Sequence, residues 1–259
     1  MKICLLGSEG FIGTHFRKLV PNVYRYDLVL GDDIRDTFKL DTVFEKERFD
    51  VVINMAARAG VRLGEEHYEE YFSTNCIGLQ NVIKACEKYG VKKFVHLSSS
   101  SKIEAKSIYG VTKLTGDCLV RNSNLDYSLI TPFTVIGEGG RKEMVLEKWK
   151  NQILKGEKVT FYGDGTSFRG YTYVEDFVKG VLLSIYAPKG EYNLGGDQKV
   201  TLEELWEIFK EVYPQAERTM LPMPEYDECG QLADTSKSYE IMEWRHTTDI
   251  KKKIKELIQ

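Results

Sequence analysis

The chain has no run of eighteen or more apolar residues, so it contains no candidate membrane-spanning helix. Its beginning, Met1-Lys2-Ile3, leads into a predicted strand without a secretory pattern, and we expect a cytoplasmic protein with no membrane partner. The five cysteines are scattered, odd in number and without a Cys-x-x-Cys pair. They fit neither a disulfide framework nor a zinc site, and we expect no bound metal.

The chain also lacks a strong charge of either sign. Its net charge of -3 and its pI near 5.9 give no overall attraction to nucleic acid or to an anionic membrane. Internal repeats and low-complexity linkers are absent from the sequence as well. Its 259 residues, 42% of them hydrophobic, are enough for one large α/β domain or for a main domain with a smaller lobe.

Short apolar runs alternate with helical patterns in the first half of the chain. The run 51–57 is apolar apart from Asn54, as expected of a parallel strand that is covered on both faces. The alternation predicts an α/β fold with a doubly wound (Rossmann) parallel sheet, whose ligand lies at the carboxyl ends of the strands. We expect a nucleotide-binding domain over 1–137, with 171–186 packing back on it, and a smaller α/β lobe over 138–259. We expect helices over 71–89, 109–122 and about 145–154, and a capping box at Thr201.

A glycine triplet follows the first predicted strand directly. Gly7 allows a tight turn, Gly10 lets the backbone approach a pyrophosphate, and Gly13 lets the next helix pack closely on the strand. Asp27 ends the second predicted strand, where a carboxylate would accept hydrogen bonds from the adenosine ribose and repel a 2'-phosphate. This pattern favours NAD over NADP, although Asp27 could equally be a turn residue. Further along, Asp33 and Ile34 could hold the adenine edge.

The segment Ser98 to Lys113 contains the residues that we expect to carry the chemistry. A row of four serines follows the strand 94–97, and Tyr109-x-x-x-Lys113 places a phenol and an ammonium on one helix face. The ammonium would favour the ionised phenol and make Tyr109 a proton acceptor. A pair at this spacing also arises by chance, and Tyr89 with Lys93 is a second one.

Taken together, these motifs resemble the NAD-dependent epimerase/dehydratase family of extended short-chain dehydrogenases over nearly the whole chain. The likeness extends to the UDP-glucuronate and UDP-glucose 4-epimerases through Ala56-Ala-Arg-Ala-Gly-Val-Arg62, Phe133-Thr-Val-Ile-Gly137 with Gly140-Arg141, and Ala233-Asp-Thr-Ser-Lys237. The same family order includes Asn75, Gly163-Asp-Gly165 with Arg169, and Tyr192-Asn-Leu-Gly-Gly196. The resemblance implies an NAD-binding enzyme that acts on a nucleotide sugar, and a homodimer formed through helices 71–89 and 109–122.

The resemblance also assigns a role to each motif residue. Tyr109 would take the sugar O4 proton, Lys113 would bind the nicotinamide ribose, and Ser99 would hydrogen-bond O4. Thr134, with Ser100 or Ser101 and Arg141, would face the sugar C6 substituent, and Arg169 would pair with the UDP diphosphate. The implied cofactor-binding set is Gly7, Gly10, Phe11, Ile12, Gly13, Asp27, Asp33, Ile34, Ala56, Ala57 and Asn75, together with Tyr109 and Lys113. The rival interpretation is a polar strand end for the serines, a turn residue for Thr134 and surface cations for both arginines.

The sequence departs from the family pattern in three places. The spacer between Ser99 and Tyr109 is short, the loop after Asp27 is brief, and the segment 228–231 has no arginine for a second phosphate contact. These departures leave the nucleotide and the sugar open.

Four functions follow from these observations. The first is a 4-epimerase that converts a UDP-hexose or UDP-hexuronate through a transient 4-keto sugar, with NAD regenerated in place. The second is a 4-ketosugar reductase or dehydrogenase, which uses the same Ser, Tyr and Lys. A 4,6-dehydratase needs an Asp-Glu pair after the serine position, where Ser100 and Ser101 stand. An NAD-sensing module without catalysis is disfavoured because the Ser, Tyr and Lys are all retained.

Overall fold

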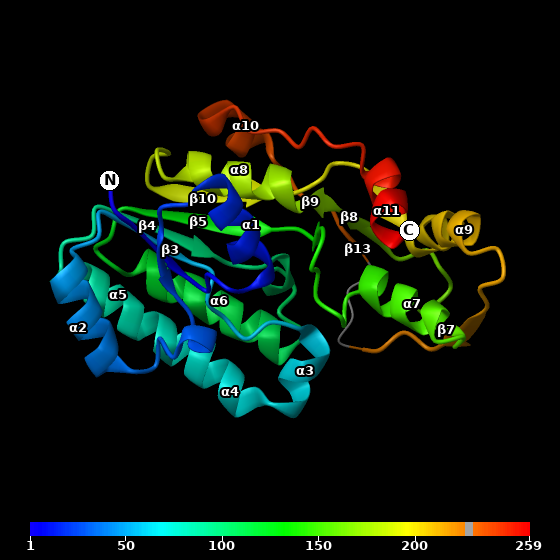
Figure 1. The fold of residues 1–259 in the computed structure, drawn as a ribbon, viewed down its shortest axis with the longest axis horizontal. Coiled ribbons are helices and arrows are strands. Elements are labelled where there is room, and N and C mark those ends of the chain that lie inside the picture. The colour runs from blue at the N-terminus through cyan, green and yellow to red at the C-terminus, as the bar shows by residue number, and fades with distance from the viewer. Residues whose placement is uncertain (226–229) are drawn as a thin grey trace.

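The structure is a computed structural model that describes residues 1–225 and 230–259, so that Glu228 and Cys229 lie outside it. Six parallel strands form its main sheet in the order β10-β5-β4-β3-β1-β2 (Figure 1), which confirms the predicted doubly wound arrangement. In chain order these strands are β1 (Ile3–Leu6), β2 (Tyr24–Tyr26), β3 (Val51–Asn54), β4 (Lys93–Leu97), β5 (Tyr127–Pro132) and β10 (Gly190–Leu194).

Helices cover both faces of this sheet. Its central strands β1, β3 and β4 are therefore buried along their whole length. In Figure 1 one face carries α1 (Phe11–Leu19), α8 (Val174–Ser184) and α10 (Ser236–Met242), and the other carries α2 (Thr37–Glu47), α5 (Leu79–Lys88) and α6 (Ile108–Arg121). Leu19 at the end of α1 and Leu114 on α6 are nevertheless 41% and 39% exposed.

The single helix expected over 71–89 is interrupted. The segment consists of α4 (Tyr68–Phe72), a π-helical stretch η2 (Ser73–Gly78) and then α5. Within η2, Asn75 is buried, and a Cβ on Gly78 would lie 2.8 Å from the Ile34 side chain. The π-helical stretch therefore holds both the buried side-chain amide of Asn75 and the close contact of Gly78 with Ile34. Hydrophobic periodicity does not reveal such an interruption of a helix.

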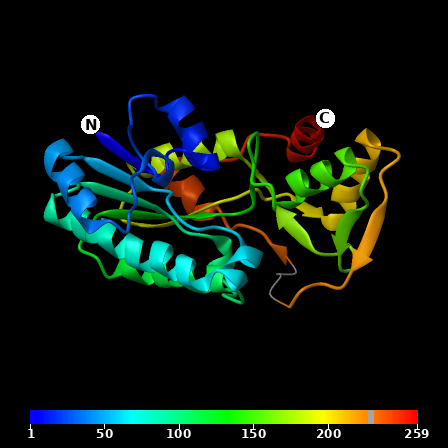
Figure 2. The same cartoon turned by 60° about the horizontal axis from the view of Figure 1, so that its bottom comes forward.

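A smaller lobe lies beside the main layer, at the right of Figure 2. The capping box predicted at Thr201 is confirmed at the start of the lobe's helix α9 (Leu202–Val212). The paired strands β6 (Val135–Ile136) and β9 (Thr172–Tyr173) join the two parts. The lobe contains α7 (Val145–Leu154), β7 (Val159–Tyr162), β8 (Phe168–Gly170), β11 (Lys199–Thr201), α9 (Leu202–Val212), β12 (Arg218–Leu221), β13 (Gly230–Gln231) and α11 (Ile250–Ile258).

Two segments beyond residue 137 belong to the main layer. Helix α8 packs against α1 and β5, and β10 pairs with β5, although residues 190–194 were assigned to the smaller lobe. One hydrophobic cluster includes Phe16 and Phe177 beside the sheet as well as Trp149 and Phe209 in the lobe. The two parts thus share a core, and the division into two domains stays a prediction. No helix among residues 1–225 and 230–259 is long and apolar enough to cross a membrane.

Candidate active site

The glycine turn forms as the sequence predicted. Gly7 has a φ of +80°, and a Cβ there would come within 2.7 Å of the backbone at Met55 and Ala56. At Gly13 a Cβ would lie 2.2 Å from the Gly7 carbonyl oxygen. At Gly10, by contrast, a Cβ would find only the Gly7 oxygen, at 3.4 Å. Protein atoms thus explain the outer two glycines, and the open side of Gly10 fits the cradle that a pyrophosphate needs.

Asp27 lies directly beside this turn. Its Oδ2 accepts a hydrogen bond from the Glu9 amide at 2.9 Å, and its Oδ1 accepts one from the Val29 amide at 3.0 Å. The second bond caps a short helix η1 (Leu28–Leu30), which makes up the brief loop seen in the sequence. Phe11 and Ile12, at the start of α1, are half-buried against the main core. The end of β2 and the glycine turn are therefore locked together, with the Asp27 carboxylate between them.

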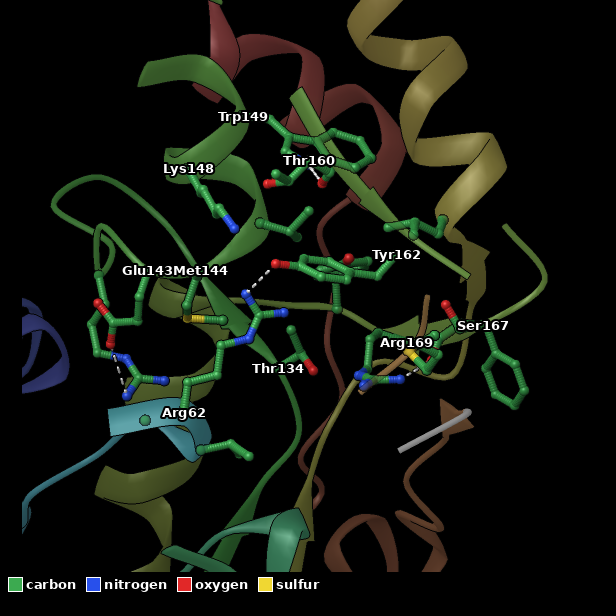
Figure 3. A pocket seen from close by; sticks show the side chains of 18 of the residues that line it. Arg62, Thr134, Glu143, Met144, Lys148, Trp149, Thr160, Tyr162, Ser167 and Arg169 are labelled. Carbon is green, nitrogen blue, oxygen red and sulfur yellow. Dashed lines mark hydrogen bonds and ion pairs between the residues drawn. The ribbon is translucent and has the colours of Figure 1, made fainter. Parts of the chain in front are cut away.

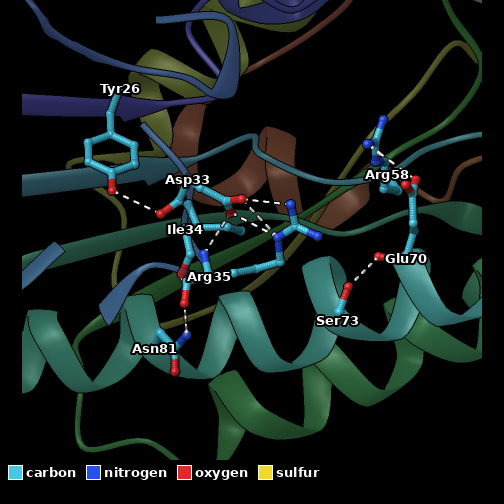
Figure 4. A network of polar contacts seen from close by, with 8 residues as sticks. All are labelled: Tyr26, Asp33, Ile34, Arg35, Arg58, Glu70, Ser73 and Asn81. Carbon is cyan, nitrogen blue, oxygen red and sulfur yellow. Dashed lines mark hydrogen bonds and ion pairs between the residues drawn. The ribbon is translucent and has the colours of Figure 1, made fainter. Parts of the chain in front are cut away.

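Asp33 and Ile34, expected at the adenine edge, both have contacts within the protein (Figure 4). Arg35 donates to both oxygens of the Asp33 carboxylate at 2.6 to 3.0 Å, and this contact lowers the pKa of Asp33. The Tyr26 hydroxyl donates to the Asp33 carbonyl. The Ile34 side chain is 4% exposed and packs against Gly78 in the core. Asp33 is thus held in an ion pair, and Ile34 contributes to packing rather than to an open surface.

Asn75 is a positioning residue in this structure. Its Oδ1 accepts from the Arg58 amide at 2.8 Å, and its Nδ2 donates to the Arg58 carbonyl and to the Thr112 hydroxyl. Both amide hydrogens are consequently used within the protein. The bonds fix the chain just after Ala56 and Ala57, which are half-buried beyond the end of β3. Asn75 thereby ties the η2 stretch, the β3 end and α6 into one unit.

The structure brings Ser99 and the Tyr109-Lys113 pair to the same strand end. Lys113 is 4% exposed, and its Nζ donates to the carbonyl of Leu97, the last residue of β4, at 2.5 Å. Ser99 follows two residues later and is 7% exposed. Tyr109 lies one turn before Lys113 on α6 and is half-buried. The buried lysine therefore links α6 to the end of β4, directly before the serine row.

Tyr89 and Lys93, the second pair at this spacing, lie on different elements. Tyr89 ends α5 and donates its hydroxyl to Asp41 at 2.7 Å, while Lys93 begins β4 and binds Asp126 and the Ala187 carbonyl. These two side chains do not share a helix, so only Tyr109 and Lys113 have the predicted arrangement.

The short spacer between Ser99 and Tyr109 is closed by a compact turn. Ser99 caps a 3-10 helix η3 (Ser100–Lys102), and Lys102 forms an ion pair with Asp117, which is fully buried on α6. A Cβ on Gly110 would lie 2.4 Å from the Ser101 carbonyl oxygen. Glycine at this position lets the turn lie directly on the helix, so fewer residues are needed to connect β4 to α6.

A cavity of about 460 Å³ lies between residues 60–63 and the smaller lobe (Figure 3), and Ser99, Tyr109 and Lys113 are not among the residues that line it. Three of the predicted substrate residues, Thr134, Arg141 and Arg169, line it, whereas Ser100 and Ser101 do not. Thr134 has a φ of +22°, a strained value for a β-branched residue, and its carbonyl accepts from the Thr172 amide at 3.1 Å. The strain marks a loop whose backbone is held firmly at the cavity wall.

The cavity has charged and aromatic residues that sequence reasoning did not assign. Arg62, at the start of α3 (Val61–Glu66), donates to the Tyr162 hydroxyl at 3.2 Å and stacks its guanidinium 4.3 Å from the ring centroid (Figure 3). Lys148 lies 5.2 Å from the same ring. Only the Ala-Gly-Val-Arg motif signalled Arg62, and no local pattern marked the other two. With Arg141 and Arg169, these cations give the cavity an excess of positive charge over Glu143.

Tyr71 connects the cavity wall to the predicted proton acceptor. Its hydroxyl lies 2.9 Å from the carbonyl oxygens of Ala59 and Gly60, and its ring packs edge-on against Tyr109 with centroids 6.2 Å apart. Burial raises the pKa of Tyr71 to about 12. Tyr71 therefore stays a neutral hydrogen-bond donor near pH 7.

A comparison with known proteins places this site in a family. Residues 3–195 match the NAD dependent epimerase/dehydratase family. A UDP-glucuronate 4-epimerase of Thermodesulfobacterium geofontis is 30% identical over 248 residues, which cover 87% of this chain and 76% of the relative. The chain belongs to the NAD-dependent epimerase/dehydratase family. As the extended short-chain dehydrogenase pattern predicted, it is an NAD-dependent enzyme.

Other members of the NAD-dependent epimerase/dehydratase family show how this chain differs. UDP-glucuronate 4-epimerase 1 of Arabidopsis thaliana is 28% identical over 326 aligned positions, covering all of this chain and 76% of the relative. An alignment longer than the 259-residue chain contains gaps on this side, consistent with shortened loops. A crystal structure of UDP-glucose 4-epimerase from Thermotoga maritima has a TM-score of 0.90 at 24% identity, over 100% of this chain and 97% of that one. The fold is therefore the family's fold.

Proposed function

We propose that this protein is an NAD-dependent nucleotide-sugar 4-epimerase that acts on a UDP-hexose or UDP-hexuronate. The observation that carries the proposal is a cationic cavity whose wall at Gly60 is bound by the hydroxyl of Tyr71, the residue whose ring packs against Tyr109. Two negative phosphates would find matching charge in that cavity, with Arg169 on β8 as a bidentate donor. The 30% identical relative named as a UDP-glucuronate 4-epimerase supports the same class of substrate.

The side chains divide the reaction between them. Tyr109 would accept the O4 proton as C4 is oxidised and return it after the 4-keto sugar has turned, while Ser99 hydrogen-bonds O4. Lys113 would favour the ionised phenol and hold the nicotinamide ribose. NAD supplies the hydride acceptor and donor, so no reducing equivalent is lost in a full cycle. Thr134 and Arg141 would face the sugar C6 substituent; Ser100 and Ser101, held in η3 outside the cavity lining, would do so only from its edge.

The test is a panel of UDP-sugars given to the purified protein without added cofactor. NMR at C4 is expected to show interconversion of one pair, such as UDP-glucose with UDP-galactose or UDP-glucuronate with UDP-galacturonate. Stoichiometric consumption of NAD or NADH with no C4 exchange would instead identify a 4-ketosugar reductase or dehydrogenase and overturn the proposal.

Tyr71→Phe tests the link between the cavity wall and the catalytic tyrosine. The substitution removes the hydroxyl that holds the 59–60 carbonyls but keeps the ring against Tyr109. We expect KM for the UDP-sugar to rise about fivefold, the effect of one hydrogen bond, with kcat changed less than twofold. Tyr186→Phe, at an exposed position outside the cavity lining, is the matched control. A loss confined to kcat would contradict this role.

We also propose that the protein forms a homodimer. Large apolar side chains are exposed on the adjoining elements α4, η2 and α6: Tyr68, Phe72, Ile77, Val111 and Leu114. A second copy that covers this face would remove them from water. Sedimentation at micromolar concentration should give twice the mass of the 29.7 kDa chain, and a monomer there would exclude the interface.

A further inference from the structure

Glu9, inside the glycine turn, is the centre of a charge cluster that the catalytic mechanism does not use. Its Oε1 is 2.9 Å from Arg25 Nε, 3.0 Å from Arg17 Nη1 and 2.8 Å from the Ser8 hydroxyl. The hydrogen bond from Arg25 is the main cause that lowers the pKa of Glu9, so the carboxylate is charged at neutral pH. One carboxylate therefore engages two guanidinium groups at the mouth of the turn.

This cluster lies next to the expected adenosine ribose site. The backbone amide of Glu9 donates to the Asp27 carboxylate. Arg25 lies in β2, and Asp27 directly follows the end of that strand. Arg17 approaches from α1. Two positive side chains near a ribose would favour a 2'-phosphate, as in NADP-binding sites that use arginine. In this chain the Glu9 carboxylate binds both of them, while the backbone amide of the same residue holds the Asp27 carboxylate.

We propose that Glu9 is a specificity-determining residue that, together with Asp27, excludes NADP from this enzyme. Glu9 acts by binding the arginines that would otherwise attract the 2'-phosphate and by repelling that phosphate directly. The inference rests on the family's NAD dependence and not on the identity of the sugar substrate. The brief loop after Asp27 makes the arrangement compact, because η1 begins at the very next residue.

The experiment is a cofactor competition without substrate. Purified protein is first freed of bound cofactor and is then equilibrated with equal excess concentrations of NADH and NADPH. After desalting, the retained cofactors are released by acid-free denaturation and quantified by chromatography. In Glu9→Gln, which keeps the size and a hydrogen-bonding oxygen, the ratio of retained NADPH to NADH is expected to rise on the order of tenfold, the effect of removing one like charge near a phosphate. Thermal melting checks that the variant is folded.

Two further variants make the result decisive. Glu47→Gln is a matched control, because Glu47 is also ion-paired and its side chain is 18% exposed, against 17% for Glu9, yet it binds Lys2 away from the turn. Its ratio should equal that of the wild type. Adding Arg25→Gln to Glu9→Gln should cancel most of the gain, since it removes a cation that the phosphate would use. An unchanged NADPH to NADH ratio in Glu9→Gln, or an equal rise in Glu47→Gln, would overturn the proposal. The readout is cofactor binding, so it stands apart from any failure to epimerise a sugar.

Discussion

Tyr109→Phe should lower turnover of the UDP-sugar by about a thousandfold, within the range expected when a general base is removed. The phenylalanine ring keeps the contact with Tyr71, and Lys113 keeps its bond to the Leu97 carbonyl, so the fold and bound NAD should be retained. The measurement combines a turnover assay with the amount of NAD released on denaturation. Loss of activity with full NAD content would assign the defect to proton transfer.

The chain contains its own control for this experiment. Tyr89 is followed by a lysine at the same spacing, but its hydroxyl binds Asp41 on α2, away from the strand end of the site. Tyr89→Phe should leave turnover unchanged. If Tyr109→Phe turned over at the wild-type rate, or if both variants lost activity equally, the assignment of Tyr109 would be wrong.

Gly13→Ala should abolish NAD retention and lower the melting temperature by roughly 5–10 °C, because overpacking of about 1–3 kcal/mol is spread over a chain of this size. The added methyl would lie 2.2 Å from the Gly7 carbonyl oxygen, which is backbone and is fixed by the turn. Helix α1 would have to move away from β1 to accommodate it. Thermal melting of the cofactor-free protein measures this effect directly.

Gly10→Ala separates packing from cofactor binding. A Cβ at Gly10 meets only the Gly7 oxygen at 3.4 Å, so the cofactor-free melting temperature should match that of the wild type within about 2 °C. NAD retention should nevertheless fall, because the methyl enters the space left for the pyrophosphate. Equal losses of melting temperature in both variants would show that the two glycines have the same structural role. That result would contradict the assignment of Gly13 to helix packing and of Gly10 to cofactor binding.

The parts of the site that were predictable from sequence depend on local geometry. Gly7 and Gly13 predict a tight turn and a helix packed closely on the strand, all within a few residues. The spacing of Tyr109 and Lys113 predicts that the two side chains share one helix face. The cavity wall was largely hidden because its members come from separate elements. Arg62, Lys148 and Tyr162 converge only when α3, α7 and β7 are placed around one space.

Two other expected cofactor residues have partners within the protein, and their role at the cofactor stays a prediction. Asn75 was expected at the cofactor, and the structure commits both of its amide hydrogens to the protein. Ile34 was expected at the adenine edge, and its side chain fills the space that Gly78 leaves in the core. A family motif preserves such residues whether they touch a ligand or hold its neighbours. The motif alone does not distinguish the two roles, whereas hydrogen-bond partners and burial do.

The position of β10 at the edge of the main sheet has a consequence for how the chain is made. Strand β5 ends at Pro132, but its partner β10 begins only at Gly190, after α7, β7 and β8 of the small lobe and α8 of the main layer have been synthesised. During translation β5 is therefore exposed as an open edge while α7, β7 and β8 emerge from the ribosome. The nascent chain needs protection from edge-to-edge association over that interval, and the interval ends when residues 190–194 close the sheet.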